Sequence, residues 1–258
     1  MLAAFAEAGR VLNNYRYLEI ATRNAAFLLT ALRPGGKLRR AWRAGQAGVE
    51  VFLEDYASLI LGLLELYQTD FNNRWFLEAY KLAGEMIERF RDPGGGFFDT
   101  PSDAESLLTR PKDLQDNATP CGNALAAEAL LKLAAFTERT EWREQADKAL
   151  SLVAEQSARY PTAFGRWLSA ADFALAAVKQ VAIIGDPSEE RTLTFIGEIR
   201  KGYHPNLVVG ASPFPAPEGA PALLADRPMV DGKPTAYVCE GFVCQKPVTD
   251  PEDFRKLL

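Results

Sequence analysis

Residues 53–79 read LEDYASLILGLLELYQTDFNNRWFLEA and contain the unit on which the fold is built. Within 53–67, apolar residues recur every three or four positions, which is the spacing of one buried face of an α-helix. A short polar stretch, residues 69–73, follows, and its Asn and Asp residues are typical of helix ends and turns. Trp75 and Ala79 then lie one helical turn apart on a second helix. This stretch therefore predicts two antiparallel helices joined by a short turn.

The same pattern occurs in two further places. In each, an apolar helix and a short polar turn are followed by an aromatic residue and, four positions later, by alanine: Tyr17 with Ala21, and Trp142 with Ala146. The repeat period is about 60 residues, which fits large helical hairpins better than the shorter helical repeats. We therefore predict three hairpins, in which the aromatic side chain packs on the first helix and the alanine permits close approach.

Long loops connect the predicted hairpins. Residues 34–36 read PGG and residues 93–96 read PGGG, and proline and glycine are typical of helix ends. We expect the second helix of each of the first two hairpins to stop at these glycines. The loops that follow, residues 34–51 and 92–118, then lie at the end of the molecule where the first helix of the next hairpin begins.

The pattern changes after the third hairpin. We predict, in order, a helix over 163–178, a strand over 180–185, a helix over 189–202, a strand over 206–210, an irregular loop over 211–234, a strand over 236–239 and a capped helix over 250–258. The first two strands flank a helix, so we expect them to pair in parallel with a right-handed crossover. The predicted fold class is mainly α: an incomplete α/α toroid of about three hairpins in residues 1–178, with a small α/β segment in residues 179–258 packed on it as one structural unit.

Composition narrows the classes of function. The chain has 258 residues, of which 48% are apolar, so it can bury a sizeable core. Its net charge of −5 argues against a nucleic-acid partner, because phosphate binding requires a basic surface. No apolar run reaches the roughly 20 residues that cross a bilayer, and the N-terminus does not resemble a signal peptide. The odd cysteine count is typical of a reducing compartment, so we expect a cytoplasmic protein.

A family resemblance rests on motifs spread over nearly the whole chain. These are FLEDYA at 52–57, GGFFDT at 95–100, RPKD at 110–113, PCGN at 120–123, YPTAFG at 160–165, and AYVCE at 236–240 followed by Cys244 and PVTDP at 247–251. With these motifs the chain resembles the C-terminal part of the spermatogenesis-associated protein 20-like family.

The resemblance implies a fold and a context. Members of that family join an N-terminal thioredoxin-like domain to a six-hairpin, glycosidase-like α/α toroid. The thioredoxin-like domain and the first half of the toroid are absent from this sequence. The resemblance therefore implies that three hairpins form half of a ring, which either self-association or the missing N-terminal half would complete.

The same resemblance implies a place for a site. The fold is similar to that of glycosidases and sugar epimerases, whose pocket lies where the inner helices begin. Paired carboxylates can act there as general acid and base, and the candidates are Glu54, Asp55 and Asp113. Aromatic rings can stack on a sugar, and Arg110 can hold a carboxylate or phosphate. The candidate substrate-binding residues are Trp42, Phe98, Asp99, Arg110, Asn117 and Asn123, with Trp167 as a further stacking candidate.

Each candidate also has a purely structural interpretation. Glu54 and Asp55 stand at a helix start, where acidic residues favour the helix dipole whatever the function. Asp99 fixes a turn on this interpretation, and Arg110 with Asp113 and Asp116 forms a salt-bridge network. Asn123 would cap its helix.

The cysteines leave a redox role open. Cys239 and Cys244 are separated by four residues, which is not the spacing of a zinc knuckle, and no second Cys or His pair accompanies them. A dithiol able to oxidise fits better. Cys121 is interpreted as a buried structural cysteine, although a helix start lowers a thiol pKa. No phosphate-binding loop or other cofactor motif is present, and with His204 as the single histidine a Ser-His-Asp triad is not expected.

Three functions remain as hypotheses, and the sequence does not decide whether the protein is an enzyme. The first is carbohydrate binding or carbohydrate processing by the acidic loop residues, within carbohydrate metabolism; it depends on analogy between folds. The alternative is a non-catalytic partner or scaffold domain of a thioredoxin-like redox protein. The third is a redox role for Cys239 and Cys244.

Overall fold

The computed structural model describes residues 1–104 and 109–258, and within these ranges it contains the three predicted hairpins. Their helices are α1 (Leu2–Val11) with α2 (Tyr15–Thr30), α3 (Leu53–Asp70) with α4 (Asn73–Phe90), and α5 (Gly122–Thr137) with α6 (Thr140–Ser151). The two helices of each pair pack along one another. The predicted hairpins and the mainly α fold class are therefore confirmed.

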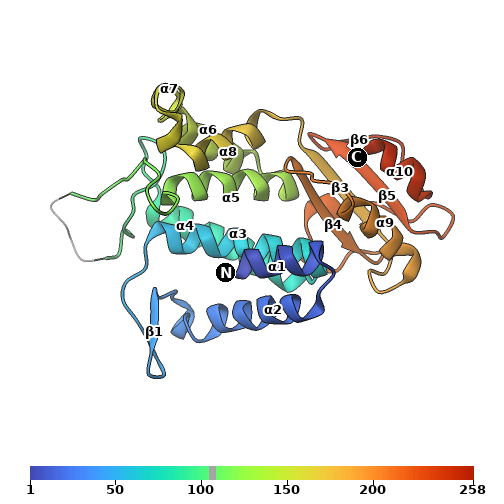
Figure 1. The fold of residues 1–258 in the computed structure, drawn as a ribbon, viewed down its shortest axis with the longest axis horizontal. Helices are drawn as coiled ribbons and strands as arrows, with labels where there is room; N and C mark the ends of the chain where they lie inside the picture. Colours follow the sequence, from blue (N-terminus) through green and yellow to red (C-terminus); the bar gives the residue numbers. More distant parts are fainter. Residues whose placement is uncertain (105–108) are drawn as a thin grey trace.

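The first helices of the three hairpins form an inner layer. α3 packs between α1 and α5, and each of these three helices packs against the second helix of its own hairpin. Figure 1 shows α2 and α6 on opposite sides of this layer. α5 is buried on most sides, as its nearly continuous apolar sequence predicts. Aromatic side chains join the layers: the ring of Tyr67 packs on Phe76 and Phe136, and Tyr80 packs on Trp142. The layered arrangement places the starts of α3 and α5 side by side.

Short turns close one end of the hairpins. Each turn contains a left-handed residue just after the first helix: Phe71 and Glu138 directly follow α3 and α5, and Asn13 is the second residue after α1. Such a residue ends a helix by turning the chain sharply, and asparagine tolerates it better than most residues. Asn14 and Asn72 then cap the second helix, each accepting a hydrogen bond from the backbone N–H two residues on. We call this the turn end of the hairpins.

The loops at the opposite end differ from the prediction in two details. α2 ends at Thr30 and α4 at Phe90, five and four positions before the first glycine of the loop that follows, and neither helix ends in a left-handed residue. Pro34–Gly36 instead forms a short 3₁₀ turn, η1. The first loop also contains a β-hairpin that the sequence pattern did not predict, β1 (Ala41–Arg43) with β2 (Gln46–Gly48). Residues 105–108 of the second loop lie outside the described ranges.

The segment after the third hairpin contains more short helices than predicted. α7 (Ala154–Arg159) and a 3₁₀ turn, η2 (Pro161–Ala163), precede α8 (Gly165–Leu175). The single helix predicted over residues 163–178 is thus shorter at both ends. Pro161 begins the 3₁₀ turn, and the chain becomes extended at Ala176 before it enters the sheet.

The α/β segment is confirmed in outline. It comprises β3 (Lys179–Ile184), α9 (Glu190–Arg200), β4 (Leu207–Ser212), a 3₁₀ turn η3 (Ala222–Leu224), β5 (Thr235–Glu240), β6 (Val243–Cys244) and α10 (Pro251–Leu257). β3 pairs with β4 in parallel, as predicted, and with β5 in antiparallel register, so the strand order is β4-β3-β5-β6. Asp250 caps α10 as expected.

Successive residues of the central strand face two different cores. Ala182 and Ile184 face the helical hairpins, whereas Val181 and Ile183 pack with Phe195 of α9 and other residues of a second, smaller core. This alternation explains why the strand is apolar throughout.

Polar contacts attach the sheet to the turn end. Gln68 Oε1 of α3 accepts a hydrogen bond from Val209 N at 3.1 Å. Gln180 of β3 donates to the Ala135 carbonyl at 2.8 Å, and Arg200 donates to the Thr69 carbonyl at 3.0 Å. The turn end is therefore occupied by the α/β segment, and the opposite end is left to the loops (Figure 1). Among the described residues, no helix is long and apolar enough to cross a membrane.

Candidate functional site

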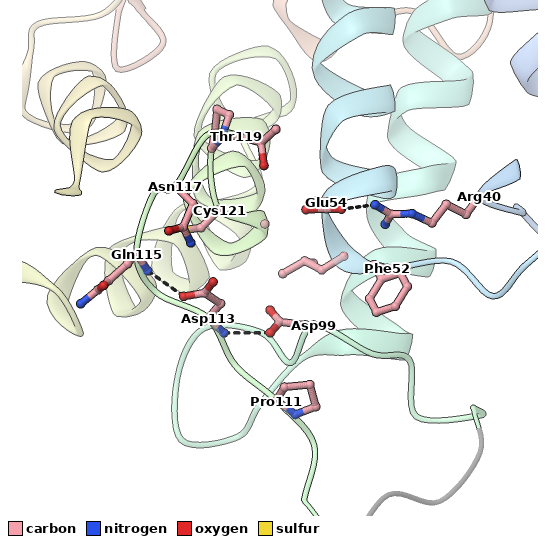
Figure 2. A pocket seen from close by; sticks show the side chains of 13 residues that line it. Arg40, Phe52, Glu54, Asp99, Pro111, Asp113, Gln115, Asn117, Thr119 and Cys121 are labelled. Carbon is pink, nitrogen blue, oxygen red and sulfur yellow. Dashed lines mark hydrogen bonds and ion pairs between the residues drawn. The ribbon is translucent and has the colours of Figure 1, made fainter. Parts of the chain in front are cut away.

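A cavity of about 400 Å³ opens where α3 and α5 begin, at the end predicted for a site. Figure 2 shows its side chains converging from these two helix starts and from the loops between the hairpins. Its lining comprises Arg40, Phe52, Leu53, Glu54, Asp99, Pro111, Asp113, Gln115, Asn117, Thr119, Pro120, Cys121 and Gly122. Four predicted site residues, Glu54, Asp99, Asp113 and Asn117, are thus brought together. We call this the acidic cavity.

The first turn of α3 separates two adjacent acidic residues. Asp55 turns back and accepts a hydrogen bond from the Phe52 backbone N–H at 2.9 Å, which caps the helix. Glu54 lines the acidic cavity and pairs with Arg40 at 2.6 Å. Burial raises the pKa of Asp55, and the Phe52 hydrogen bond and Arg40 oppose the rise. Asp55 therefore has the helix-capping role that an acidic residue at a helix start can have, whereas the side chain of Glu54 lines the cavity.

Asp99 is held beside α3 by backbone contacts on both sides. Its carbonyl accepts from Leu53 N at 2.9 Å, and its N–H donates to the Pro111 carbonyl at 2.8 Å. Its Oδ2 accepts from the Asp113 N–H at 2.8 Å. These three contacts fix the carboxyl group of Asp99 at the junction of two loops and a helix start.

The environment of Asp99 disfavours its negative charge. Burial raises the pKa of Asp99 above its ordinary value, the hydrogen bond from Asp113 N opposes that rise, and the negative charges of Asp113 and Glu54 add to it. Asp99 therefore keeps its proton to higher pH than an exposed aspartate does.

Asp113 and its neighbours form the opposite wall. Asp113 Oδ1 accepts from the Gln115 N–H at 3.0 Å, a local turn that holds the side chain in place. The Asn117 N–H donates to the Thr119 carbonyl at 3.1 Å. The loop from 111 to 120 is therefore stabilised by its own hydrogen bonds while polar side chains line the cavity.

Asn123 supports this wall from behind and does not line the cavity. It is fully buried, and its Oδ1 accepts from the Phe97 N–H at 2.8 Å. Its Nδ2 donates to the carbonyls of Phe97 and Asp113, at 2.9 and 3.2 Å. The structure thus places this predicted substrate-binding residue behind the cavity wall, with contacts at both the oxygen and the nitrogen of its amide.

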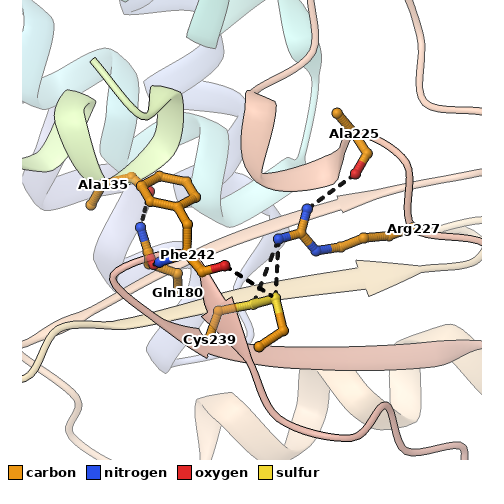
Figure 3. Close-up of a disulfide and its surroundings, with 7 residues drawn as sticks. Ala135, Gln180, Ala225, Arg227, Cys239 and Phe242 are labelled. Atoms are coloured by element: carbon orange, nitrogen blue, oxygen red, sulfur yellow. Dashed lines mark hydrogen bonds between the residues drawn. A yellow bond between two sulfur atoms is a disulfide. The ribbon is translucent and has the colours of Figure 1, made fainter. Parts of the chain in front are cut away.

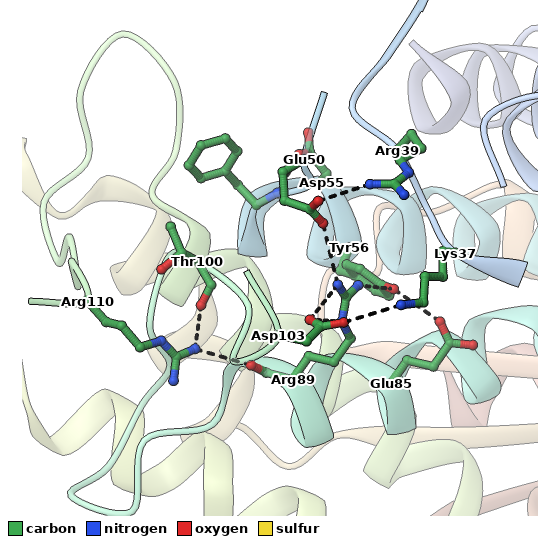
Figure 4. A network of polar contacts seen from close by, with 11 residues as sticks. Lys37, Arg39, Glu50, Asp55, Tyr56, Glu85, Arg89, Thr100, Asp103 and Arg110 are labelled. Carbon is green, nitrogen blue, oxygen red and sulfur yellow. Dashed lines mark hydrogen bonds and ion pairs between the residues drawn. The ribbon is translucent and has the colours of Figure 1, made fainter. Parts of the chain in front are cut away.

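Arg110 and Phe98 also lie outside the cavity lining. Arg110 donates to the carbonyls of Arg89 and Thr100, and its guanidinium carbon lies 4.2 Å from the centre of the Phe98 ring. Figure 4 shows that Arg89 continues this network, with Asp103 at 2.8 Å and the Tyr56 hydroxyl at 3.0 Å. The network joins the second loop to α3 and α4, so Arg110 and Phe98 stabilise the loop and are absent from the cavity lining.

The two tryptophans predicted to stack on a sugar do not line the acidic cavity, whereas Phe52 does. Trp42 lies on β1, 46% exposed, and packs edge-on against Phe27, outside the lining. Trp167 is buried and donates its indole N–H to the Leu114 carbonyl at 2.9 Å. Phe52 lines the acidic cavity instead, with the guanidinium carbon of Arg40 at 4.9 Å from its ring centre. Phe52 is the first residue of the FLEDYA motif, which is the signal that could have identified it.

Cys121 is a buried structural cysteine, as predicted. Its Sγ accepts from the Ala124 N–H at 3.4 Å at the start of α5. Burial raises the pKa of Cys121 to about 11, which outweighs this hydrogen bond. The expected lowering of the thiol pKa at a helix start is therefore wrong here.

Cys239 and Cys244 lie far from the acidic cavity, on β5 and β6, and are joined as a disulfide (Figure 3). Among the residues that the structure describes, no three His, Cys, Asp or Glu side chains are grouped closely enough to hold a metal ion.

Known proteins with similar sequences show to which proteins this chain is related. No family model matches the chain. Spermatogenesis-associated protein 20 of Homo sapiens is 31% identical to it over 278 aligned residues, which cover 100% of this chain and 35% of the human protein. The chain is a relative of spermatogenesis-associated protein 20. The protein of that name from Rattus norvegicus is 32% identical over the same shares.

A more distant relative agrees. An uncharacterized protein of Caenorhabditis elegans is 27% identical over 94% of this chain and 34% of its own length. The predicted resemblance to spermatogenesis-associated protein 20 is thus confirmed, and the chain spans about a third of the length of these curated relatives.

Proposed function

We propose that the acidic cavity binds a carbohydrate and that its carboxyl groups take part in processing it. The observation that carries this proposal is the convergence of Glu54, Asp99 and Asp113 on one cavity, where Asp99 has a raised pKa. A volume of about 400 Å³ is within the range of small-molecule sites.

The lining suits a polyhydroxylated ligand. Carboxylate oxygens accept hydrogen bonds from sugar hydroxyls, and the side-chain amides of Gln115 and Asn117 can both donate and accept. Phe52 contributes an apolar ring surface at the rim, 37% exposed. The cavity therefore combines the polar and apolar contacts that a sugar ring requires.

The raised pKa of Asp99 supports a processing role. A carboxyl group that holds its proton beside ionised carboxylates can act as a general acid, and an ionised neighbour can act as the base. Asp99 fits the first role because burial and the negative charges of Asp113 and Glu54 raise its pKa. Glu54 and Asp113 line the same cavity and are the candidates for the second role. This assignment gives Asp99, which was predicted as a substrate-binding residue, the catalytic role that was predicted for Asp55.

A saccharide panel tests the proposal. We expect at least one mono- or oligosaccharide to bind the wild-type chain in ligand-observed NMR, and Asp113→Asn to weaken its affinity by about tenfold or more through loss of a charged acceptor. Glu141→Gln is the matched control, because Glu141 is an exposed acid at the turn end. Absence of binding across the panel, or equal weakening by the control, contradicts the proposal.

A second candidate is a partner or scaffold role, supported by a groove of about 740 Å³ on the face of the inner helices that α2, α4 and α6 leave uncovered. Ion pairs line it: Arg10 with Glu65 at 2.7 Å, and the nearly buried Glu128 with Lys132 at 2.9 Å. We propose that a second copy of the chain covers this groove, because a half-ring would need a second half to close. We further propose that the protein acts in the cytoplasm as a partner or scaffold of a thioredoxin-like protein.

Sedimentation over a hundredfold concentration range tests this second candidate. We expect a concentration-dependent dimer that Glu128→Ala, but not Glu141→Ala, weakens. A monomer throughout the range contradicts self-association and leaves the carbohydrate proposal unaffected.

A further inference from the structure

The disulfide between Cys239 and Cys244 is asymmetric in its access to solvent. Cys239, on β5, is fully buried, whereas its cross-strand partner Cys244, on β6, is exposed. A dissolved thiolate can therefore approach the sulfur of Cys244 more readily than that of Cys239. Attack at Cys244 would make Cys239 the leaving group.

A single cation contacts both sulfurs. Arg227 Nη2 lies 3.2 Å from Cys244 Sγ and 3.6 Å from Cys239 Sγ. Figure 3 shows the guanidinium group of Arg227 beside the disulfide. Its Nη1 donates to the Ala225 carbonyl at 3.1 Å, and its guanidinium carbon lies 5.9 Å from the Tyr237 ring centre. These contacts hold the guanidinium group over the S–S bond.

The charge of Arg227 lacks a close carboxylate. Within the described ranges, no Asp or Glu oxygen lies within 4.0 Å of its guanidinium group, and its Nε is buried without a hydrogen-bond partner. Burial lowers the pKa of Arg227, although Glu138, Tyr237 and Asp226 oppose this. A thiolate formed at Cys239 would give this half-buried cation the anionic partner that it otherwise lacks.

The side chain of Gln180 links the turn of the hairpin that carries the disulfide to the helices. Gln180 Oε1 accepts from the Phe242 N–H in the β5–β6 turn at 2.7 Å, and Gln180 Nε2 donates to the Ala135 carbonyl of α5 at 2.8 Å. β6 pairs with β5 through only two residues, one of which is Cys244. The state of the disulfide thus bears on how firmly this edge of the sheet is held.

We propose that the Cys239–Cys244 disulfide is a thiol–disulfide exchange site for a dithiol, entered at Cys244, with Arg227 stabilising the thiolate that leaves at Cys239. This inference is independent of the acidic cavity.

The exchange balances in two steps. A thiolate of the dithiol attacks Cys244 Sγ, the Sγ–Sγ bond breaks, and its electron pair leaves on Cys239 Sγ. The dithiol's second sulfur, after losing its proton, then attacks the dithiol sulfur of the mixed disulfide, and Cys244 leaves as a thiolate. Both protein thiolates take up protons, so the dithiol loses two electrons and two protons and the protein disulfide gains them.

Reduction of the whole oxidised chain by dithiothreitol tests the role of Arg227. Thiols are trapped by alkylation at timed intervals and counted by mass spectrometry, with Arg227→Gln and Arg227→Lys as a charge-removing and a charge-keeping variant. In Arg227→Gln the pKa of the Cys239 thiol should be higher, because the positive charge beside it is lost. Reduction should then be slower by about threefold for each unit of increase in that pKa. Arg227→Lys should react close to the wild-type rate. Equal rates for wild type and Arg227→Gln, or three free thiols after oxidation, overturn the proposal.

Single-cysteine variants test the point of entry independently of Arg227. With glutathione disulfide as the probe, Cys239→Ser should acquire a glutathione adduct at Cys244, found by peptide mapping. In Cys244→Ser, the amount of glutathione adduct formed at the buried Cys239 in the same time should be at least about tenfold smaller. Adduct formation at Cys239 as fast as at Cys244 overturns the proposed order of attack.

Discussion

The two ends of the helical hairpins use the same kinds of polar residue for different purposes. At the turn end, Asp70 accepts from the Asn72 N–H with one oxygen and from the Trp75 indole N–H with the other, at 2.9 and 3.0 Å. At the loop end, Asp99 receives a donor at Oδ2 alone within the described ranges. Burial raises the pKa of both aspartates.

This comparison shows which property distinguishes a site from a structural cap. A raised pKa occurs at both ends, so it does not identify the site by itself. The difference is that Asp70 has a donor for each oxygen, whereas Asp99 lines an open cavity together with two other carboxyl groups. Substitutions at the turn end should therefore change stability alone, and those at the loop end should change ligand binding as well.

The largest effect is expected from Trp75→Ala at the turn end. Trp75 is 2% exposed and donates to Asp70, so its truncation leaves a large void and an unpaired carboxylate oxygen. The free energy of unfolding should fall by about 4 kcal/mol, measured by urea denaturation. Lys81→Ala, an exposed change on the same helix, should alter it by less than about 0.5 kcal/mol. A loss of saccharide affinity in folded Trp75→Ala protein would break the proposed separation of the two ends.

A smaller loss of stability, coupled to a loss of binding, is expected from Asn123→Ala. The substitution leaves the buried N–H and carbonyl of Phe97 without their partner and frees the Asp113 carbonyl. We expect a loss of about 3 kcal/mol in the free energy of unfolding. Because the same contacts hold the wall that carries Asp113, saccharide affinity should also fall. Unchanged affinity would show that this wall is not part of the binding site.

The smallest effect, and the most specific, is a change in pH dependence for Asp99→Asn. The pKa of Asp99 is raised in the folded chain, so its protonated form stabilises the fold fully below the unfolded pKa of about 4, and this contribution is lost as pH rises through the folded pKa. The variant cannot ionise. Its free energy of unfolding should therefore increase relative to wild type as pH rises from below about 4 toward neutral. A difference that is constant with pH, in urea denaturation at each pH, contradicts the raised pKa.

The hairpins could be predicted because their signals are local. Helical spacing and the polar turn residues at 13–14, 69–73 and 137–140 all lie within short windows of sequence. The β1–β2 hairpin and α7 are too short to produce such a period, so the sequence analysis missed them.

The site was harder to predict because it depends on side-chain direction. Glu54 and Asp55 are adjacent, but one residue on a helix turns the side chain by about 100°, so one lines the cavity and the other caps the helix. Asn123 and Arg110 have the residue types of a binding site, yet backbone groups of neighbouring loops take up their donors and acceptors. Phe52 was missed because an apolar residue before a helix start resembles ordinary packing.

Hydrogen exchange of backbone amides tests the central claim most directly. The chain is compared with and without the tightest-binding saccharide of the panel, at saturation. We predict slower exchange in residues 52–54 and 111–122, the segments that contain lining residues of the acidic cavity, and unchanged exchange in the turns at 69–73 and 137–140. Slower exchange at the turn end, or none in residues 111–122 although the saccharide is bound, would contradict the assignment of the acidic cavity as the binding site.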